Sequence, residues 1–284
     1  NADNVRKMEK AWGASGMSDK AGMPVTEMIP KAHAGEIKAL YIIGENPLVS
    51  DPDLNHAEES IDHLDFLVVQ DIFMTETAEK ADVVLPSACF AEKEGTFTNT
   101  ERRVQRVRKA VNPPGAARAD WKITADIAKR MGYAMMYEDA EAVFEELASV
   151  TPSYGGLTYA RIESEGLHWP CPTADHPGTP ILHSASFPIG KGNLHAIDYI
   201  PPAEQVDADY PLYLTTGRVL YQYHTGTMTR KTKGLNEKSP ESFVEISPAD
   251  AEKYGLNDGD KVRIASRRGE IVARLTISDM AVDG

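Results

Sequence analysis

The sequence predicts an α/β fold, in which a parallel sheet with helices on both faces is followed by a smaller β-barrel. The first observation is a set of short apolar runs: IKALYIIG at 37–44, FLVV at 66–69 and DVVL at 82–85. Segments of helix length separate these runs, a pattern typical of parallel strands that are buried on both faces. The second observation is a series of short strand patterns between Tyr210 and the end of the chain.

Helical patterns fill the rest of the first half of the chain. We expect helices at 4–12, 25–34, 52–63, 75–80, 120–131 and 139–148. The helix at 52–63 connects the first two strands and places Ala57 and Ile61 on one face, and the helix at 75–80 connects the second strand to the third. Asp120 is the expected N-cap of its helix, because a carboxylate there accepts a hydrogen bond from a first-turn backbone amide.

The residue composition and pattern of the chain change twice after these helices. Proline, glycine and histidine accumulate from Thr151 onward, which predicts an extended surface connection with a short hairpin at 192–197. Strand patterns then follow at 210–216, 242–246, 261–266 and 270–278. We therefore expect an α/β domain at 1–150, an extended connection at 151–207 and a β-barrel domain at 208–284.

The last strands come with local turn and cap signals. Ser247, Pro248 and Asp250 open a short helix, with a side-chain cap, a proline at the first position and an acidic residue at the third. Arg268–Gly269 is the expected turn of a hairpin between the last two strands. Because strand patterns continue almost to Gly284, we expect the barrel to be incomplete.

Composition narrows the class of partner. The net charge is −13 at pH 7, which argues against nucleic acid or an anionic membrane as the main partner. No apolar run has the length of a membrane span, and no signal-peptide pattern is present. Cys89 and Cys171 lie far apart, so this chain alone supports neither a disulfide framework nor an iron–sulfur cluster. The chain starts at Asn1 in an apparent helix, and we expect it to be part of a longer protein.

Polar residues follow each of the three predicted parallel strands. Gly44–Pro47 follows the first strand, Gln70–Asp71 the second and Ser87 the third. Right-handed crossovers place the carboxyl ends of such strands at one edge of the sheet, where open α/β sheets bind their ligands. A glycine at such a strand end lets backbone amides approach a ligand closely. The sequence therefore predicts a site for a large polar ligand at this edge.

Six ordered blocks of sequence resemble one enzyme family. They are GENPLVSDPDL at 44–54, VVQDIFMTETAEKADVVLP at 68–86, EKEGTFTNTERRVQ at 92–105, ADWKITADIAKRMGY at 119–133, LTTGRVLYQYHTGTMTR at 214–230 and EISPADAEKYGLNDGDKVRIASRRG at 245–269. In this order they resemble the catalytic (alpha) subunit of molybdenum or tungsten formate dehydrogenases, within the bis(molybdopterin guanine dinucleotide) oxidoreductase superfamily. The resemblance implies a Rossmann-like α/β domain and a double-psi-like β-barrel.

The resemblance also implies a set of cofactor-binding residues. They are Gly44, Glu45, Asn46, Ser50, Gln70, Asp71, Ser87, Asp120, Thr216, Gly217, Arg218, His224 and Thr225. The residues at the strand ends are expected to hold a pterin guanine dinucleotide, and those after 215 to reach the pyrophosphates and pterins. Asp120 is the expected guanine reader, because its carboxylate can accept hydrogen bonds from guanine N1–H and the exocyclic amine, a donor pair that adenine lacks. An arginine supplies bidentate phosphate recognition.

Each of these residues also has a structural interpretation. Gly44–Pro47 and Gln70–Asp71 fit ordinary strand-ending turns, and Ser87 fits a turn or helix cap. For Asp120 a capping role alone explains its position, and His224 fits a structural histidine. Both interpretations stay open at this point.

No residue of this chain is assigned to catalysis or to metal binding. The polar run at 92–103 is typical of a solvated face, although the resemblance places it near the cofactor. Cys89 fits a small buried apolar residue. His33, His56 and His63 fit structural or solvated side chains.

The resemblance defines what is expected outside this chain. In the family, a four-cysteine motif for a 4Fe-4S cluster, a cysteine or selenocysteine ligand to the metal, and an adjacent histidine and arginine lie upstream of the matched blocks. We therefore expect an internal fragment that holds the molybdenum or tungsten cofactor together with the remaining part of the same subunit. Alone, it is expected to be free of cofactor and inactive.

The implied reaction is the reversible oxidation of formate to CO2. Electrons are expected to pass to iron–sulfur clusters and then to iron–sulfur or flavin electron-transfer subunits, towards NAD or ferredoxin. A cytoplasmic location is expected, with the periplasm as the alternative. Two other functions stay open: a related enzyme such as nitrate reductase, which shares the HTGTMTR-type loop, and a non-catalytic structural subunit of a respiratory complex.

Overall fold

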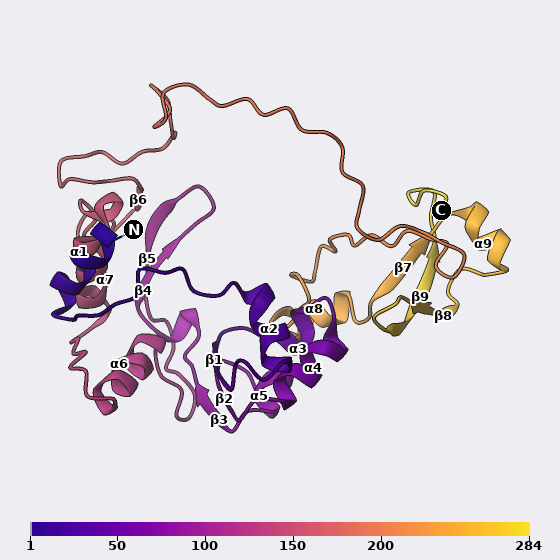
Figure 1. Ribbon diagram of the computed structural model, residues 1–284, viewed down its shortest axis with the longest axis horizontal. Coiled ribbons are helices and arrows are strands. Elements are labelled where there is room, and N and C mark those ends of the chain that lie inside the picture. The colour runs from indigo at the N-terminus through magenta and orange to yellow at the C-terminus, as the bar shows by residue number, and fades with distance from the viewer. Residues whose placement is uncertain (1) are drawn as a thin grey trace.

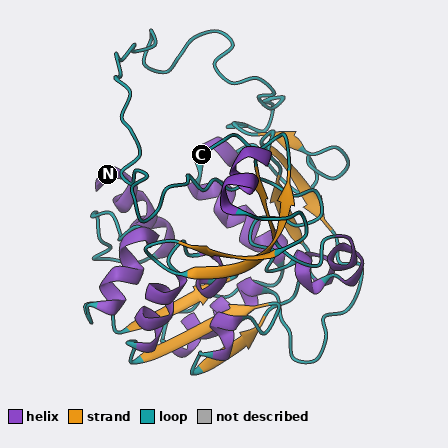
Figure 2. Ribbon diagram, turned by 90° about the vertical axis from the view of Figure 1, so that its right-hand side faces the viewer, coloured by secondary structure: helices purple, strands orange, loops and turns teal. Residues whose placement is uncertain are grey.

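A computed structural model describes residues 2–284, whose strands form a parallel, an antiparallel and a mixed sheet (Figures 1 and 2). The elements up to the end of the parallel sheet are α1 (Ala2–Trp12), α2 (Val25–His33), β1 (Ala39–Ile43), α3 (Pro47–Ser50), α4 (Leu54–Asp62), β2 (Phe66–Asp71), α5 (Glu76–Glu79) and β3 (Val83–Pro86). Those that follow are β4 (Gly95–Thr98), β5 (Arg103–Val107), α6 (Asp120–Arg130), α7 (Ala140–Val150), β6 (Leu167–His168), α8 (Lys233–Lys238), β7 (Phe243–Ile246), α9 (Pro248–Tyr254), β8 (Lys261–Ala265) and β9 (Glu270–Ile277).

The first sheet has the order β1-β2-β3, and both strand pairs are parallel. Ile42 lies opposite Val69, and Val69 lies opposite Val84. This face of the sheet buries Val69 against Ile61 of α4 and Ala78 of α5. The parallel sheet, its strands and the two crossover helices predicted from the apolar runs are thereby confirmed.

The opposite face of this sheet is largely open. Tyr41, Ile43, Phe66 and Val83 project from it and are between 38% and 50% exposed. Near the carboxyl ends of the strands, Asp120 of α6 accepts a hydrogen bond from Gln70 on this face. The prediction of helices on both faces is therefore not met within residues 2–284. The apolar pattern of the strands indicates that both faces of the sheet are suited to burial, but it does not indicate which segment covers each face.

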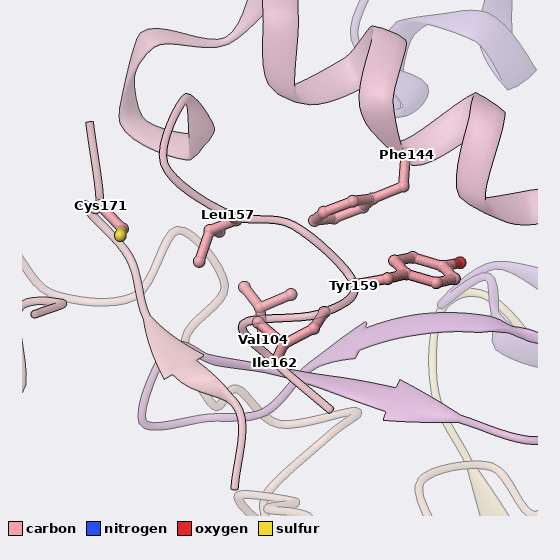
Figure 3. Packing of buried hydrophobic residues seen from close by; sticks show 6 residues of the cluster. All are labelled: Val104, Phe144, Leu157, Tyr159, Ile162 and Cys171. Carbon is pink, nitrogen blue, oxygen red and sulfur yellow. The ribbon is translucent and has the colours of Figure 1, made fainter. Parts of the chain in front are cut away.

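An antiparallel sheet with the order β4-β5-β6 follows, in a segment where the sequence predicts only a solvated polar face. No residue from 92 to 103 is buried, in agreement with a solvated face, but the strand pairing is not predicted, and the next residue, Val104, is buried. Val104 packs in a cluster with Phe144 of α7 and with Leu157 and Tyr159 from the loop that follows (Figure 3). Thus the stretch from 151 to about 180 contributes core side chains, whereas the sequence predicts an extended surface connection there.

The chain from 181 to 210 contains neither helix nor strand and runs as a long extended segment (Figure 1). Leu194 and Ile197 are 99% and 88% exposed. The predicted hairpin at 192–197 is not formed, and an isolated bridge joins Phe187 to Gly190 instead. A proline- and glycine-rich segment without a neighbouring strand has no partner for a hydrogen-bond ladder.

The last sheet has the order β7-β9-β8, with β7 parallel to β9 and β8 antiparallel to β9. The predicted helix is confirmed as α9, in which Ser247 accepts a hydrogen bond from the amide of Asp250 and Gly255 ends the helix with a φ of +65°. The predicted strand at 210–216 is not formed. In this segment the Tyr213 amide donates a hydrogen bond to the carbonyl of Gly284, beyond the end of β9. The strands described do not close into a barrel. None of the helices described is long and apolar enough to cross a membrane.

Candidate cofactor site at the sheet rim

The loops after β1, β2 and β3 form one edge of the parallel sheet, here called the sheet rim (residues 44–50, 70–75 and 87–92). Gly44 adopts a φ of +64°, a conformation that favours glycine, and donates its amide to the Gln70 carbonyl over 2.9 Å. An added Cβ at Gly44 would meet no atom within 4 Å, so the space beside this backbone is open. The strand ends thus meet at one edge, as the parallel topology requires.

Asn46 fixes the first rim loop to α5. Its Oδ1 accepts hydrogen bonds from the amide and the hydroxyl of Thr77, over 3.2 and 2.7 Å, and its Nδ2 donates to Glu76 Oε2 over 2.8 Å. The pKa of Glu76 is lowered, first by a backbone hydrogen bond and then by the hydrogen bond from the Asn46 side chain. The charge of Lys231 lowers it further. Because Asn46 is 4% exposed, these side-chain hydrogen bonds hold the loop in place against α5. Ser50 closes the same loop by donating to the Asn46 carbonyl over 3.1 Å.

A chain of polar side chains runs from Tyr41 through Gln70 to Asp120. Gln70 is 0% exposed; its Oε1 accepts from the Tyr41 hydroxyl, and its Nε2 donates to Asp120 Oδ1 over 2.8 Å. Lys93 donates to the other carboxylate oxygen of Asp120. Burial opposes ionisation of Asp120, but the hydrogen bonds from Lys93 and Gln70 and the proximity of Ser87 outweigh it, and the pKa of this carboxyl is lowered. Burial, and then the charge of Asp120, raise the pKa of Tyr41.

Asp120 does not cap its helix, and the capping prediction is wrong. It is the first residue of α6, Ala119 occupies the N-cap position, and no side chain caps the helix. The carboxylate instead turns towards Gln70 and Lys93, which lie 50 and 27 residues away in sequence. Its orientation is therefore set by tertiary contacts, and it carries a negative charge at neutral pH.

Ser87 and Asp71 complete the rim in different ways. The Ser87 hydroxyl is buried and has no well-aligned hydrogen-bond partner, although it lies close enough to Asp120 to contribute to the lowered pKa of that carboxyl. Asp71 accepts a hydrogen bond from the Phe73 amide over 3.0 Å, which is the geometry of a turn. Ser87 thus places a buried hydroxyl close to Asp120, whereas one oxygen of Asp71 serves the turn.

The predicted cofactor-binding residues beyond 215 lie in a second segment, residues 216–231. Thr216, Gly217, Arg218, His224 and Thr225 are all exposed. His224 has a φ of +49°, and its ring lies edge-on to Tyr223 at 4.3 Å between ring centroids. Lys231, which ends this segment, helps to lower the pKa of Glu76, the first residue of α5.

This second segment is held by residues that the sequence-based prediction omits. Gln222 is buried, donates to the Ser239 carbonyl over 2.9 Å and accepts from Thr229 over 2.7 Å. Gly226, at a φ of +80°, packs against the Arg230 side chain, whose Cγ would lie 2.9 Å from an added Cβ. At the rim, the omitted residues are Tyr41 and Lys93. Neither gives a distinct signal in the sequence, because a tyrosine within a strand and a lysine in a charged run are common in proteins that bind no cofactor.

Two family descriptions and several known relatives match most of the chain. The family described as Molybdopterin oxidoreductase matches residues 7–130, and the Molydopterin dinucleotide binding domain matches residues 212–284. The F420-dependent formate dehydrogenase 1 subunit alpha of Methanococcus maripaludis is 50% identical over 97% of this chain and 41% of its own length. The F420-dependent formate dehydrogenase subunit alpha of Methanocaldococcus jannaschii is also 50% identical, over 98% of this chain and 42% of its own length.

More distant relatives share the same span. The assimilatory nitrate reductase catalytic subunit of Bacillus subtilis is 41% identical over 98% of this chain and 41% of its own length. Among solved structures, acetylene hydratase from Pelobacter acetylenicus aligns with a TM-score of 0.70 at 21% identity, covering 99% of this chain and 41% of that one, which shows the shared fold. The chain thus spans about two fifths of the length of these relatives. With both characteristic domains matched in order, the chain belongs to the molybdopterin oxidoreductase family.

Proposed function

We propose that this chain is the cofactor-holding part of a formate dehydrogenase, which oxidises formate reversibly to CO2, a proton and two electrons. The observation that carries the proposal is the 50% identity, along 97% of the chain, to a protein named as a formate dehydrogenase alpha subunit. The chain contributes binding and orientation, and no acid–base group of this chain is assigned to the reaction. When bound, a molybdenum or tungsten bis(molybdopterin guanine dinucleotide) would supply the redox chemistry.

The residues of the sheet rim fit the guanine end of such a cofactor. Asp120 is ionised and uses one contact on each oxygen, with Gln70 and with Lys93. A carboxylate has about four lone-pair sites, so two sites remain for the N1–H and amine donors of guanine. The Ser87 hydroxyl, which lies close to Asp120, and the open backbone at Gly44 add polar groups beside it. Glu45, Asn46, Ser50, Gln70 and Asp71 complete the proposed set.

The second segment fits the phosphate end. Arg218 is exposed and has no hydrogen-bond or ion-pair partner within residues 2–284, so its guanidinium is free to bind a pyrophosphate bidentately. Thr216 and Thr225 offer hydroxyls, Gly217 permits close approach of the backbone, and His224 offers a ring nitrogen. The network of Gln222 and Thr229 would hold this segment in shape.

The open face of the parallel sheet supports a role for the remaining part of the same subunit. Four apolar or aromatic side chains on that face are at least 38% exposed, and monomeric proteins rarely leave such contiguous patches uncovered. We propose that further helices of the subunit cover this face and that further strands complete β7-β9-β8 as a double-psi-like barrel. The domain limits of 1–150, 151–207 and 208–284 belong to the same proposal.

Electron transfer requires groups beyond this chain. We propose a 4Fe-4S cluster in the remaining part of the subunit and partner subunits that carry iron–sulfur or flavin groups. Three of the relatives are named as F420-dependent, and this favours F420 as an acceptor to be tested beside NAD and ferredoxin. A cytoplasmic location is part of this proposal and is tested by cell fractionation.

A nitrate reductase is the second candidate, because one relative at 41% identity is named as an assimilatory nitrate reductase. The test is a pair of assays on the intact protein: formate-dependent reduction of a viologen dye, and dye-dependent reduction of nitrate. Formate turnover without nitrate turnover supports the proposal, and the reverse result replaces it. Absence of both, in protein with stoichiometric molybdenum or tungsten, would contradict both candidates.

A further inference from the structure

Three histidines that are separated in sequence meet where α2 packs on α4. His33 is the last residue of α2, His56 lies in the first turn of α4, and His63 follows its last residue. The rings of His33 and His56 lie 4.8 Å apart between centroids, and those of His33 and His63 lie 4.9 Å apart. Glu59 stands one turn after His56 on the same helix. This cluster lies outside the proposed cofactor site.

One atom each from His33, His56 and Glu59 could ligate a single ion. These ligand atoms all lie within 4.8 Å of one another. Two ligands of one zinc ion are at most about 4.2 Å apart, twice a Zn–N bond. Small side-chain rotations therefore suffice to bring the three atoms to coordination distance. Two imidazoles and a carboxylate, with a water in the fourth position, are a common tetrahedral ligand set for zinc.

The charges around the cluster single out Glu59. Its neighbours on α4, Glu58 and Asp62, are both paired with Lys80, over 2.9 and 2.8 Å. Glu59 has no such ion pair within residues 2–284, and it is exposed next to two imidazoles. A free carboxylate beside two imidazoles is suited to a cation, because it supplies negative charge as well as a ligand atom.

His63 supports the cluster from one side. Its Nδ1 lies 2.6 Å from the Glu59 carbonyl. A carbonyl oxygen can only accept, so this nitrogen carries the hydrogen and the ring is held against His33. The ring of His63 thereby limits the movement of His33, and the helix backbone at Glu59 is tied to the same contact.

We propose that His33, His56 and Glu59 form a binding site for a divalent transition-metal ion, with Zn2+ as the expected occupant. The site would join the C-terminal end of α2 to the start of α4. The contacts between these helices already bury Ile29 and Ala32 of α2 and Ala57 of α4. Binding to the folded protein but not to the unfolded chain would raise its thermal stability.

The test uses the intact protein after treatment with a chelator and dialysis. Zinc chloride is then added at micromolar free concentration, and bound zinc is measured by equilibrium dialysis with elemental analysis. The His33→Phe variant retains an aromatic ring for packing but has no ligand atom, and Glu59→Gln removes only the charge. His195→Phe, in the extended segment, is the matched control. We expect the first two variants to bind zinc at least tenfold more weakly and to lose the zinc-dependent rise in Tm, with the control unchanged.

Two results would overturn the proposal. In one, the wild-type protein binds no more zinc than His33→Phe does. In the other, zinc binds, but substitutions at His33, His56 and Glu59 leave its affinity unchanged, which would place the bound zinc elsewhere. To separate loss of a ligand from loss of fold, the Tm of each variant is measured without metal, and a value within a few degrees of wild type is required. If His33→Phe falls below that range, Glu59→Gln and His56→Gln decide the outcome.

Discussion

Substituting Asp120 separates its structural contribution from its proposed role in reading guanine. In Asp120→Ala, the buried Nε2 of Gln70 loses its acceptor, which costs about 1–3 kcal/mol. Lys93 also loses its partner, but both side chains are partly exposed, at 26% and 37%, so screening limits that loss to about 1 kcal/mol. We therefore expect a destabilisation of about 2–4 kcal/mol. No helix-capping loss is added, because the side chain makes no capping hydrogen bond.

Asp120→Asn is the more informative change. The amide oxygen still accepts from Gln70, so the destabilisation should fall to about 1 kcal/mol, the screened pair with Lys93. The amide presents one acceptor and one donor, whereas guanine requires two acceptors, so cofactor retention should fall almost as far as in Asp120→Ala. Asp126→Asn is the matched control, because Asp126 is an exposed, arginine-paired residue on the same helix.

The assay measures three quantities on the intact protein: urea-induced unfolding, molybdenum or tungsten per chain, and guanine nucleotide released by acid. The expected result is an Asp120→Asn protein of nearly normal stability and reduced guanine content. Full guanine content in that variant would refute the reading of guanine by Asp120. A destabilisation well below 1 kcal/mol in Asp120→Ala would refute the network through Gln70.

Three further changes test the geometry elsewhere. Gly226→Ala forces a φ of +80° on a residue with a Cβ and crowds Arg230, so we expect about 1–2 kcal/mol of destabilisation by urea unfolding, and an unchanged midpoint would contradict the tight packing. Leu157→Ala, at a side chain that is 2% exposed, should cost about 2–5 kcal/mol; a loss below 1 kcal/mol would show that the loop does not pack as described. Burial and the hydrogen bond to Glu146 raise the pKa of Tyr137 to about 12, so its contribution to stability is present below about pH 10, the unfolded pKa, and is lost as the pH rises through 12. The phenolate absorbance that is lost in Tyr137→Phe should titrate near pH 12, and a midpoint near 10 would contradict this.

Local sequence signals predict the elements that depend on local chemistry. The apolar runs at β1, β2 and β3 identify a parallel sheet, and Ser247 with Pro248 identifies the start of α9, because strand burial and capping act over a few residues. The hairpin of β4 and β5 escapes prediction, because most of its outward residues are charged or polar and Val104 is flanked by such residues. The strand expected at 210–216 fails for the opposite reason: its pattern is suited to a sheet, but no neighbouring strand is present within the described residues.

Side-chain networks depend on partners that sequence order does not bring together. Asp120 has the local signature of a cap, yet its carboxylate is directed by Gln70, which lies 50 residues earlier. His33 and His56 each look like isolated surface histidines, and only the packing of α2 on α4 places their rings 4.8 Å apart. In both cases the residue type is compatible with several roles. Side chains on another element decide which of these roles the residue takes. For Asp120, the resemblance to a family leads to a proposed long-range role, the reading of guanine. It cannot do so for His33, whose interpretation rests on the geometry of this chain alone.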